Sequence, residues 1–257
     1  MPIITRLLLG LLLLAIPAYA YFMFNRAPLR KLALAVARML LQLSVLGGCL
    51  WVVYHYDSPW LTALWIVAMT LVVATATCQR VRLPRRLVPW VAAGIGGGIV
   101  LPLLYLLLVV IRPELPASAR WLVPLTGVLL AHVLLTNTTS LGTFYRKIKE
   151  EQTRYEELLG NGLKRRHALA PFIGEALLSM ARPAVVYLSA MGLLTMPMLL
   201  SGLLLGGASP VDAVLLTVLL VVAAQTAAVA SLLLTLWATD RQVFDRRGNL
   251  RGDVLEG

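Results

Sequence analysis

The 257-residue chain is 59% hydrophobic and 14% charged, with 23 Lys and Arg residues against 12 Asp and Glu residues. Soluble domains are usually about 45–50% apolar and about 25% charged, so this composition excludes an ordinary soluble domain and indicates an integral membrane protein. The net charge of +11 is explained by basic cytoplasmic loops, and we expect no nucleic acid as a partner.

Apolar runs of about the length needed to cross a bilayer recur along the chain. The first, residues 7–24, also imitates a signal peptide, because Arg6 precedes it and Ala18-Tyr19-Ala20 resembles a cleavage site. We expect this run to be retained, since its removal would upset the topology described next; cleavage is the alternative. The chain is therefore predicted to be all-α, a single transmembrane domain over residues 1–257. The other six runs are 32–54, 60–78, 87–111, 121–141, 173–200 and 210–238.

The basic residues are concentrated in alternate loops. The loops after the first, third and fifth runs and the C-terminal tail hold most of them, whereas the opposite loops hold only Arg112 and Arg120. Because Lys and Arg are retained on the cytoplasmic side, the sequence predicts about seven transmembrane helices with the N-terminus outside and the C-terminus cytoplasmic. We expect a multi-pass protein of the cell inner membrane, in contact with membrane lipid.

A few polar residues lie inside the apolar runs. Arg38 and Gln42 lie four residues apart on one face of the second run. A charged arginine at the bilayer centre costs roughly 3 kcal/mol, so Arg38 should face the protein interior, or reach the cytoplasmic edge by snorkelling. The fifth run ends in a polar stretch that contains Asn137, and Arg182 interrupts the sixth run beside Pro183. These side chains form a candidate polar route through the helices.

Residues 142–172 form the only long charged segment between the two apolar halves. Apolar side chains recur there with the period of a helix while charged ones fill the other face, so an amphipathic helix is predicted. Glycine and asparagine tolerate the left-handed backbone that ends helices, and residues 160–162 should therefore end it. A second short helix, rich in basic residues, should follow and stop near Pro171. The apolar positions are Ile148, Tyr155, Leu158, Leu159 and Leu163.

We interpret this charged segment as a cytoplasmic segment to which a partner protein binds. The alternative is a juxtamembrane segment that rests on anionic lipid headgroups, where each lysine or arginine contributes roughly 1 kcal/mol. The chain has no G-x-x-x-x-G-K-[ST] loop, no HExxH and no GxSxG motif. We therefore expect that the chain is not itself an enzyme. A partner chain should supply the energy for any transport against a gradient.

Residues 192–210, GLLTMPMLLSGLLLGGASP, are dense in glycine and proline. Such residues interrupt a helix at membrane depth, which is tolerated only where protein or water covers the freed backbone. Ser209, Pro210 and Asp212 have the pattern of an N-cap, a first-turn proline and an acidic third residue of the last helix. A plain hairpin between two spans is the alternative.

Four stretches carry motifs of a known family. In the spans, the matching positions are Arg38-x-x-x-Gln42-Leu43-x-x-x-Gly47 and Asn137, the latter at the asparagine of a GNxM stretch. In the cytoplasmic segment, the pattern IExxLALGAxxxxA is matched at Glu156, Leu159, Gly162 and Ala168. In the turn, the pattern GLVxLPGMMTGQILGGxxP is matched at Gly192, Leu193, Pro197, Gly202, Leu205, Gly206, Gly207 and Pro210. Together these motifs resemble the permease subunits of the iron-export ABC transporter family, which includes plant aluminium-tolerance half-transporters, over nearly the whole chain.

The resemblance implies an ATP-driven exporter in which two copies of this chain, as a homodimeric permease, pair with two copies of a separate ABC ATP-binding subunit. The chain itself would hold no cofactor, because ATP and Mg²⁺ would bind to the partner subunit. The resemblance also implies a metal ion as the transported substrate, with iron as the first candidate. The implied ATPase-coupling residues are Glu156, Leu159, Gly160, Gly162 and Ala168. The candidate translocation pathway comprises Arg38, Gln42, Asn137, Arg182, Met196, Pro197 and Ser201.

The turn departs from the family pattern at the positions best suited to bind a metal. Leu199 and Leu200 stand where the family has paired methionines, and Leu203 stands where it has glutamine. Thioether sulfur is a soft ligand and amide oxygen a harder one, so their loss weakens the metal prediction more than the permease prediction. Two other interpretations stay open: an ATP-independent channel or secondary transporter that uses Arg38 and Arg182, and a scaffold that recruits a cytoplasmic partner without transport.

Overall fold

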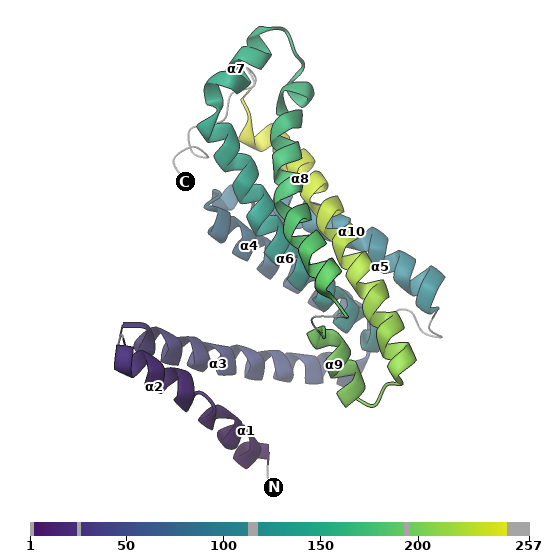
Figure 1. The fold of residues 1–257 in the computed structure, drawn as a ribbon. Coiled ribbons are helices and arrows are strands. Elements are labelled where there is room, and N and C mark those ends of the chain that lie inside the picture. The colour runs from purple at the N-terminus through teal and green to yellow at the C-terminus, as the bar shows by residue number, and fades with distance from the viewer. Residues whose placement is uncertain (1–2, 25–26, 113–117, 193–195, 246–257) are drawn as a thin grey trace. The chain divides into compact units, whose positions relative to one another are not determined.

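The computed structural model describes residues 3–24, 27–112, 118–192 and 196–245, and every regular element among them is a helix (Figure 1). The chain divides into two compact units, residues 1–56 and residues 57–257. Within the described ranges, six helices are long and apolar enough to cross a membrane. The prediction of an all-α, multi-pass membrane protein is therefore confirmed.

The 1–56 unit differs from the sequence prediction in its first run, which is broken into two helices. Pro17 has no backbone N–H to donate to the carbonyl of Leu13, so a helix across residues 13 and 14 loses a bond of its ladder. The backbone there makes tighter contacts instead, with the N–H of Leu13 bonded to the carbonyl of Gly10 at 3.2 Å. The helices of this unit are α1 (Ile3–Leu12), α2 (Ala15–Phe24) and α3 (Ala27–Tyr56).

The 57–257 unit is a bundle in which α6 packs against α4, α8 and α10, and α10 also packs against α5. The Asp57 carboxylate accepts bonds from the Ser118 hydroxyl at 3.2 Å and from the Ala119 N–H at 2.8 Å, so α4 and α6 begin at the same end. The helices of this unit are α4 (Pro59–Val81), α5 (Val88–Tyr105), α6 (Ala119–Glu150), α7 (Gln152–Gly160), α8 (Arg165–Ala190), α9 (Met198–Leu205) and α10 (Pro210–Val243), with short helical turns at Arg85–Leu87 and Leu106–Ile111.

Two glycines allow α5 and α10 to pack with their backbones in contact. A Cβ atom added to Gly94 would lie 2.5 Å from the Thr235 Cα, and one added to Gly98 would lie 2.4 Å from the Ser231 Cα. Small residues at this spacing let helices approach closely when apolar side chains give no preference between lipid and protein. The G-x-x-x-G spacing of Gly94 and Gly98 is the sequence signal for this contact.

The helix boundaries near the sixth span differ from the prediction in two ways. The predicted span 173–200 is wrong at its end, because α8 stops at Ala190 and α9 is a separate short helix. The predicted stop near Pro171 is also wrong, because α8 starts at Arg165 and continues through that proline. Ala168, Phe172 and Ala176 are buried at helical spacing on both sides of Pro171, and this packing outweighs the one lost bond.

The start of α10 has the predicted form. The Ser209 hydroxyl accepts a bond from the Asp212 N–H at 3.2 Å and donates one to the Asp212 carboxylate at 2.6 Å. Pro210 is the first residue of the helix. The cap is confirmed, and it fixes where the last span begins.

Candidate coupling site

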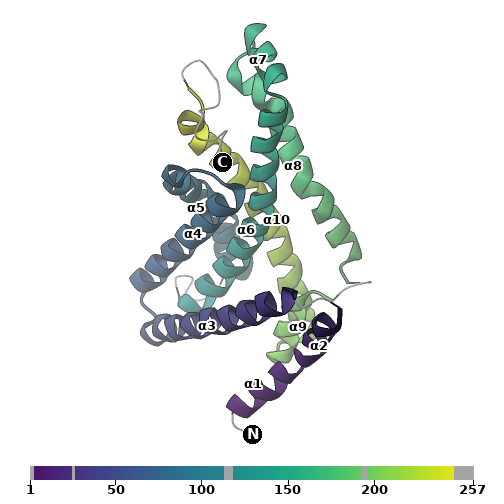
Figure 2. The same cartoon turned by 90° about the vertical axis from the view of Figure 1, so that its left-hand side faces the viewer.

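The charged segment lies at one end of the 57–257 unit, where α6 ends, α7 crosses and α8 begins (Figures 1 and 2). α6 extends unbroken from the fifth span to Glu150, and the backbone then leaves the helical conformation at Glu151, with φ −111° and ψ 35°. The predicted amphipathic face is confirmed at Ile148 and Tyr155, which are both 1% exposed. The segment is thus an extension of two spans rather than a separate surface helix.

Gly162 ends the turn between α7 and α8 in a left-handed conformation, with φ +81°. Its N–H bonds to the Leu159 carbonyl at 3.0 Å, and the N–H of Leu163 bonds to the Leu158 carbonyl at 3.3 Å. This pair of bonds is a Schellman motif, which favours glycine at the left-handed position. The prediction that glycine ends this helix is confirmed.

An aromatic cluster holds α7 against α8 and the end of α10. The Tyr155 ring lies 6.1 Å from the Phe172 ring and 6.0 Å from the Phe244 ring, measured between centroids. Burial raises the pKa of Tyr155 to about 12, so its hydroxyl stays neutral at physiological pH. Arg165, at the start of α8, forms an ion pair with Asp240 of α10 and lies 5.6 Å from the centroid of the Phe244 ring. Packed side chains and an ion pair therefore join the turn to α8 and to the end of α10.

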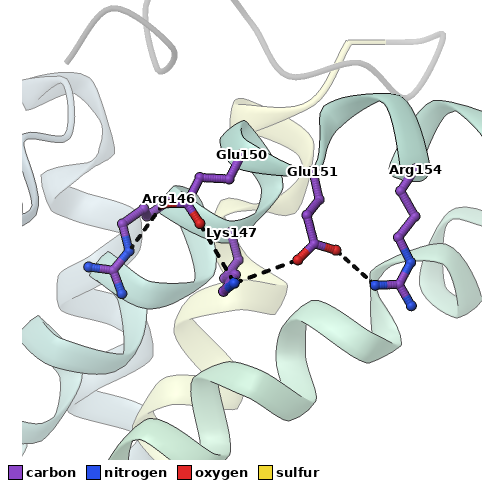
Figure 3. Close-up of polar contacts among 5 residues, drawn as sticks. All are labelled: Arg146, Lys147, Glu150, Glu151 and Arg154. Carbon is purple, nitrogen blue, oxygen red and sulfur yellow. Dashed lines mark hydrogen bonds and ion pairs between the residues drawn. The ribbon is translucent and has the colours of Figure 1, made fainter.

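A ladder of exposed charges runs along the end of α6 onto α7 (Figure 3). Lys147 lies 3.7 Å from Glu150 and 3.6 Å from Glu151, and Arg154 lies 2.8 Å from Glu151. The hydrogen bond from Arg154 lowers the pKa of Glu151, so the small stabilisation it gives is present above the carboxyl's ordinary pKa and is lost as the pH falls through the lowered value. Exposed pairs of this kind are weak and screened by salt, so the ladder orients the break at Glu151 more than it stabilises the fold.

The five predicted coupling residues divide into two groups. Glu156, Gly160 and Gly162 are exposed, so a partner can reach them. Ala168 is fully buried and Leu159 packs against the core. The structure thus places the first three on the surface of α7 and of the turn that follows it, and it packs the other two into the core.

Within the 57–257 unit, the predicted pathway residues are not gathered in one place. Asn137 is fully buried in α6 and donates from its amide to the Ser231 hydroxyl at 2.9 Å, while its carbonyl oxygen has no partner among the described residues. Arg182 is exposed on α8. Met196 is exposed, Pro197 is buried, and Ser201 is half-buried in α9. Arg38 and Gln42 are exposed on α3, in the 1–56 unit.

A small cavity of about 180 Å³ adjoins the start of α9. Pro197 lines it as predicted, together with His132 of α6 and Gln225 of α10. Sequence reasoning missed these two, because His132 lacks the spacing of a metal site and a single glutamine in an apolar run is more often a helix-packing residue than a ligand. Among the described residues, no group of three or more His, Cys, Asp or Glu side chains is placed to hold a metal ion.

A model of the family described as Uncharacterised protein family (UPF0014) matches residues 4–244. The chain belongs to this family. The UPF0014 membrane protein slr1647 of Synechocystis sp. is 29% identical over 185 residues, which is 71% of each chain. The "Probable iron export permease protein FetB" of Escherichia coli is 21% identical over 218 residues, 84% of this chain and 82% of that one. "Protein ALUMINUM SENSITIVE 3" of Arabidopsis thaliana is 26% identical over 186 residues, 72% of this chain and 66% of the plant protein.

No solved structure matches the chain. The UPF0014 match spans both structural units, and the relatives include an iron export permease and a plant aluminium-sensitivity protein by name. The resemblance to the iron-export permease family, predicted from motifs, is therefore confirmed. This UPF0014 protein is a multi-pass membrane protein of permease type.

Proposed function

We propose that this UPF0014 protein is the membrane-spanning permease subunit of an ATP-driven ABC exporter and works as a homodimer with a separate ATP-binding subunit. The proposal rests on the exposed turn at Gly162. The charged segment around this turn is continuous with two candidate spans, α6 and α8, and an aromatic contact joins it to the end of a third, α10. Glu156 on α7 and Gly162 on that turn, at the family's coupling positions, are both exposed. We propose residues 1–257 as one permease domain in which residues 142–172 form the coupling segment.

ATP would act through this segment by a rigid-body switch. Closure of the ATP-binding subunits would press on the turn, and the cluster around Tyr155 would carry the displacement into α8 and α10. The turn has to bind the two states of the ATPase unequally, because a contact with equal affinity for both shifts no equilibrium. ATP and Mg²⁺ would be held by the partner subunit.

The proposed cargo is a metal ion, iron first, as the printed name of the FetB relative suggests. The proposed pathway includes Asn137 and the cavity beside Pro197, because Asn137 is a fully buried amide within a candidate span and the cavity leaves space between candidate spans. Met196 and Met198 are exposed near that cavity, and thioether sulfur suits soft metal ions.

The proposed orientation places the coupling turn and the C-terminus in the cytoplasm of a cell with the chain in its inner membrane. In a Cys49→Ser background, Asn161→Cys should react with a membrane-impermeant maleimide in inverted vesicles and stay unlabelled in intact spheroplasts. Arg120→Cys is the matched control, because Arg120 is exposed near the opposite end of α6 and should show the reverse pattern. Labelling of Asn161→Cys from the outer side would invert the proposed topology.

The proposed function is tested by flux in inverted membrane vesicles that contain the chain and its host's ABC subunits. Radiolabelled iron(II) should accumulate in these vesicles with ATP and not with a non-hydrolysable analogue. Vesicles without the chain are the control. Accumulation that is independent of ATP would favour the ATP-independent channel or secondary transporter instead.

Asn137→Leu should reduce ATP-driven flux while the protein stays folded. The lost bond to Ser231 should cost about 0.6 kcal/mol of stability, the average for such bonds between membrane helices. Loss of the free amide oxygen as a metal ligand should lower flux about tenfold, which corresponds to about 1.4 kcal/mol. Ser231→Ala is the control, since it removes the same bond and leaves the amide in place. Equal flux for both variants and the wild type would remove Asn137 from the pathway.

A further inference from the structure

A cleft of about 820 Å³ lies at the same end of the 57–257 unit as the coupling turn. Its walls come from the start of α5, the end of α6, the start of α8 and the end of α10. This volume is in the range of sites that bind a whole small ligand. Neither the proposed pathway nor the coupling turn uses it.

The cleft combines apolar walls with a cationic mouth. Arg165, Arg166 and Arg241 line it, and Asp240 is its one acidic lining residue. Asp240 is committed to Arg165, whereas Arg166 and Arg241 are exposed and form no ion pair within the described part of the chain. Two guanidinium groups are therefore left to bind an anion. The apolar wall below them includes Leu169, Ile173, Leu233 and Leu236.

Two exposed tryptophans flank the cleft. Trp90 is 42% exposed and Trp237 is 70% exposed, and both line it. Tryptophan is enriched at the depth of lipid headgroups, where one part of the ring is wet and the other contacts acyl chains. Their presence places the mouth of the cleft at the membrane surface, with its apolar wall facing the acyl chains.

We propose that this cleft is a binding site for one anionic phospholipid, whose phosphate contacts Arg166 and Arg241 and whose acyl chain lies along the apolar wall. The inference rests on the proposed orientation, which puts the site in the leaflet that presents anionic lipid to the coupling turn. A zwitterionic lipid also carries a phosphate, but its ammonium group cancels the net charge, so two arginines favour a lipid with a net negative charge. A soluble anion leaves the apolar wall without a partner, so the combination fits a charged lipid and not a free phosphate.

The site would also bridge α8 and α10. Arg166 belongs to α8 and Arg241 to α10, and these are the two helices that the aromatic cluster joins to the coupling turn. A single phosphate that contacts both arginines adds a second link between the same helices. Bound lipid should therefore stabilise the coupling end of the molecule.

The test uses the full-length chain, purified in detergent and stripped of lipid. Phosphatidylglycerol should raise its melting temperature and be retained in native mass spectra, whereas phosphatidylcholine and inorganic phosphate should do neither. Two arginines at a membrane surface predict a preference of about thirtyfold for phosphatidylglycerol over phosphatidylcholine. The double variant Arg166→Gln/Arg241→Gln should lose this preference and keep the lipid-free melting temperature, because both side chains are exposed.

The matched control is Arg80→Gln/Arg85→Gln, which removes two exposed charges from the same end of the unit but outside the cleft. It should respond to phosphatidylglycerol as the wild type does. An unchanged response in Arg166→Gln/Arg241→Gln, an equal response to inorganic phosphate, or no response to phosphatidylglycerol in the wild type would each overturn the proposal. A dimer that separates in the cleft variant without any lipid effect would assign the face to a second copy of the chain. None of these measurements involves ATP or flux, so they can fail while the proposed permease function stands.

Discussion

Gly98→Ala should unfold the 57–257 unit at a clearly lower temperature than the wild type. The added methyl group would lie 2.3 Å from the backbone nitrogen of Ser231 and 2.4 Å from its Cα. Both are backbone atoms and cannot turn aside, so α5 and α10 have to separate along their contact. Overpacking of this kind costs about 1–3 kcal/mol, occasionally more. Thermal unfolding in detergent, followed by tryptophan fluorescence and size-exclusion chromatography, measures the loss.

Gly96→Ala is the matched control for this prediction. Its methyl group would meet only the Thr70 methyl group at 3.7 Å, an ordinary contact. Alanine favours a helix over glycine by about 1 kcal/mol, so this variant should be as stable as the wild type or more stable. If both variants unfolded at the same temperature, the backbone contact between α5 and α10 would not contribute to the stability of the bundle.

Tyr155→Ala should free α7 from the bundle and uncouple the turn from the spans. Truncating a fully buried aromatic ring costs about 3–5 kcal/mol, and here the ring joins α7 to Phe172 and Phe244. Because the loss is local to the end of the unit, the spans should stay assembled while protease cuts the 152–164 region much faster. Limited proteolysis of the purified chain measures this difference.

Tyr155→Phe keeps the ring contacts and serves as the control. Loss of the hydroxyl should cost about 1 kcal/mol, so proteolysis should stay close to that of the wild type. Equal protection of Tyr155→Ala and wild type would mean that α7 is held by other contacts. The route proposed for transmitting force would then be wrong.

Local features of this chain were predictable because they depend on a few neighbouring residues. The cap at Ser209 and Asp212 and the glycine that ends α7 are of this kind, since each is set by one hydrogen bond or one φ angle. The six later spans were predictable from length and apolarity alone.

Features that depend on tertiary packing were not predictable in the same way. Local rules predict that a helix stops near Pro171. However, α8 continues through this proline because Ala168 and Phe172 are buried on either side of it. The first apolar run is the opposite case, because no residue of α2 is buried and the helix breaks ahead of Pro17.

The candidate site shows the same division. The spacing of Tyr155 identified it as a buried position, but its partner Phe244 lies beyond the predicted end of the last span, at 238. The ion pair between Arg165 and Asp240 joins residues 75 positions apart, and no periodicity reports such a contact. His132 and Gln225 were visible as polar residues in apolar runs, and only the fold shows that they line one cavity.

Co-purification of an ABC ATPase with the tagged chain from its own membranes tests the central claim most directly. We expect an ATPase to co-purify with the wild type. Glu156→Arg/Gly162→Leu should release this ATPase or abolish its stimulation, because Glu156 on α7 and Gly162 on the turn are both exposed. Glu157→Arg reverses a neighbouring exposed charge and should leave the complex intact. A folded, monodisperse wild-type chain that brings down no ATPase would contradict the permease account.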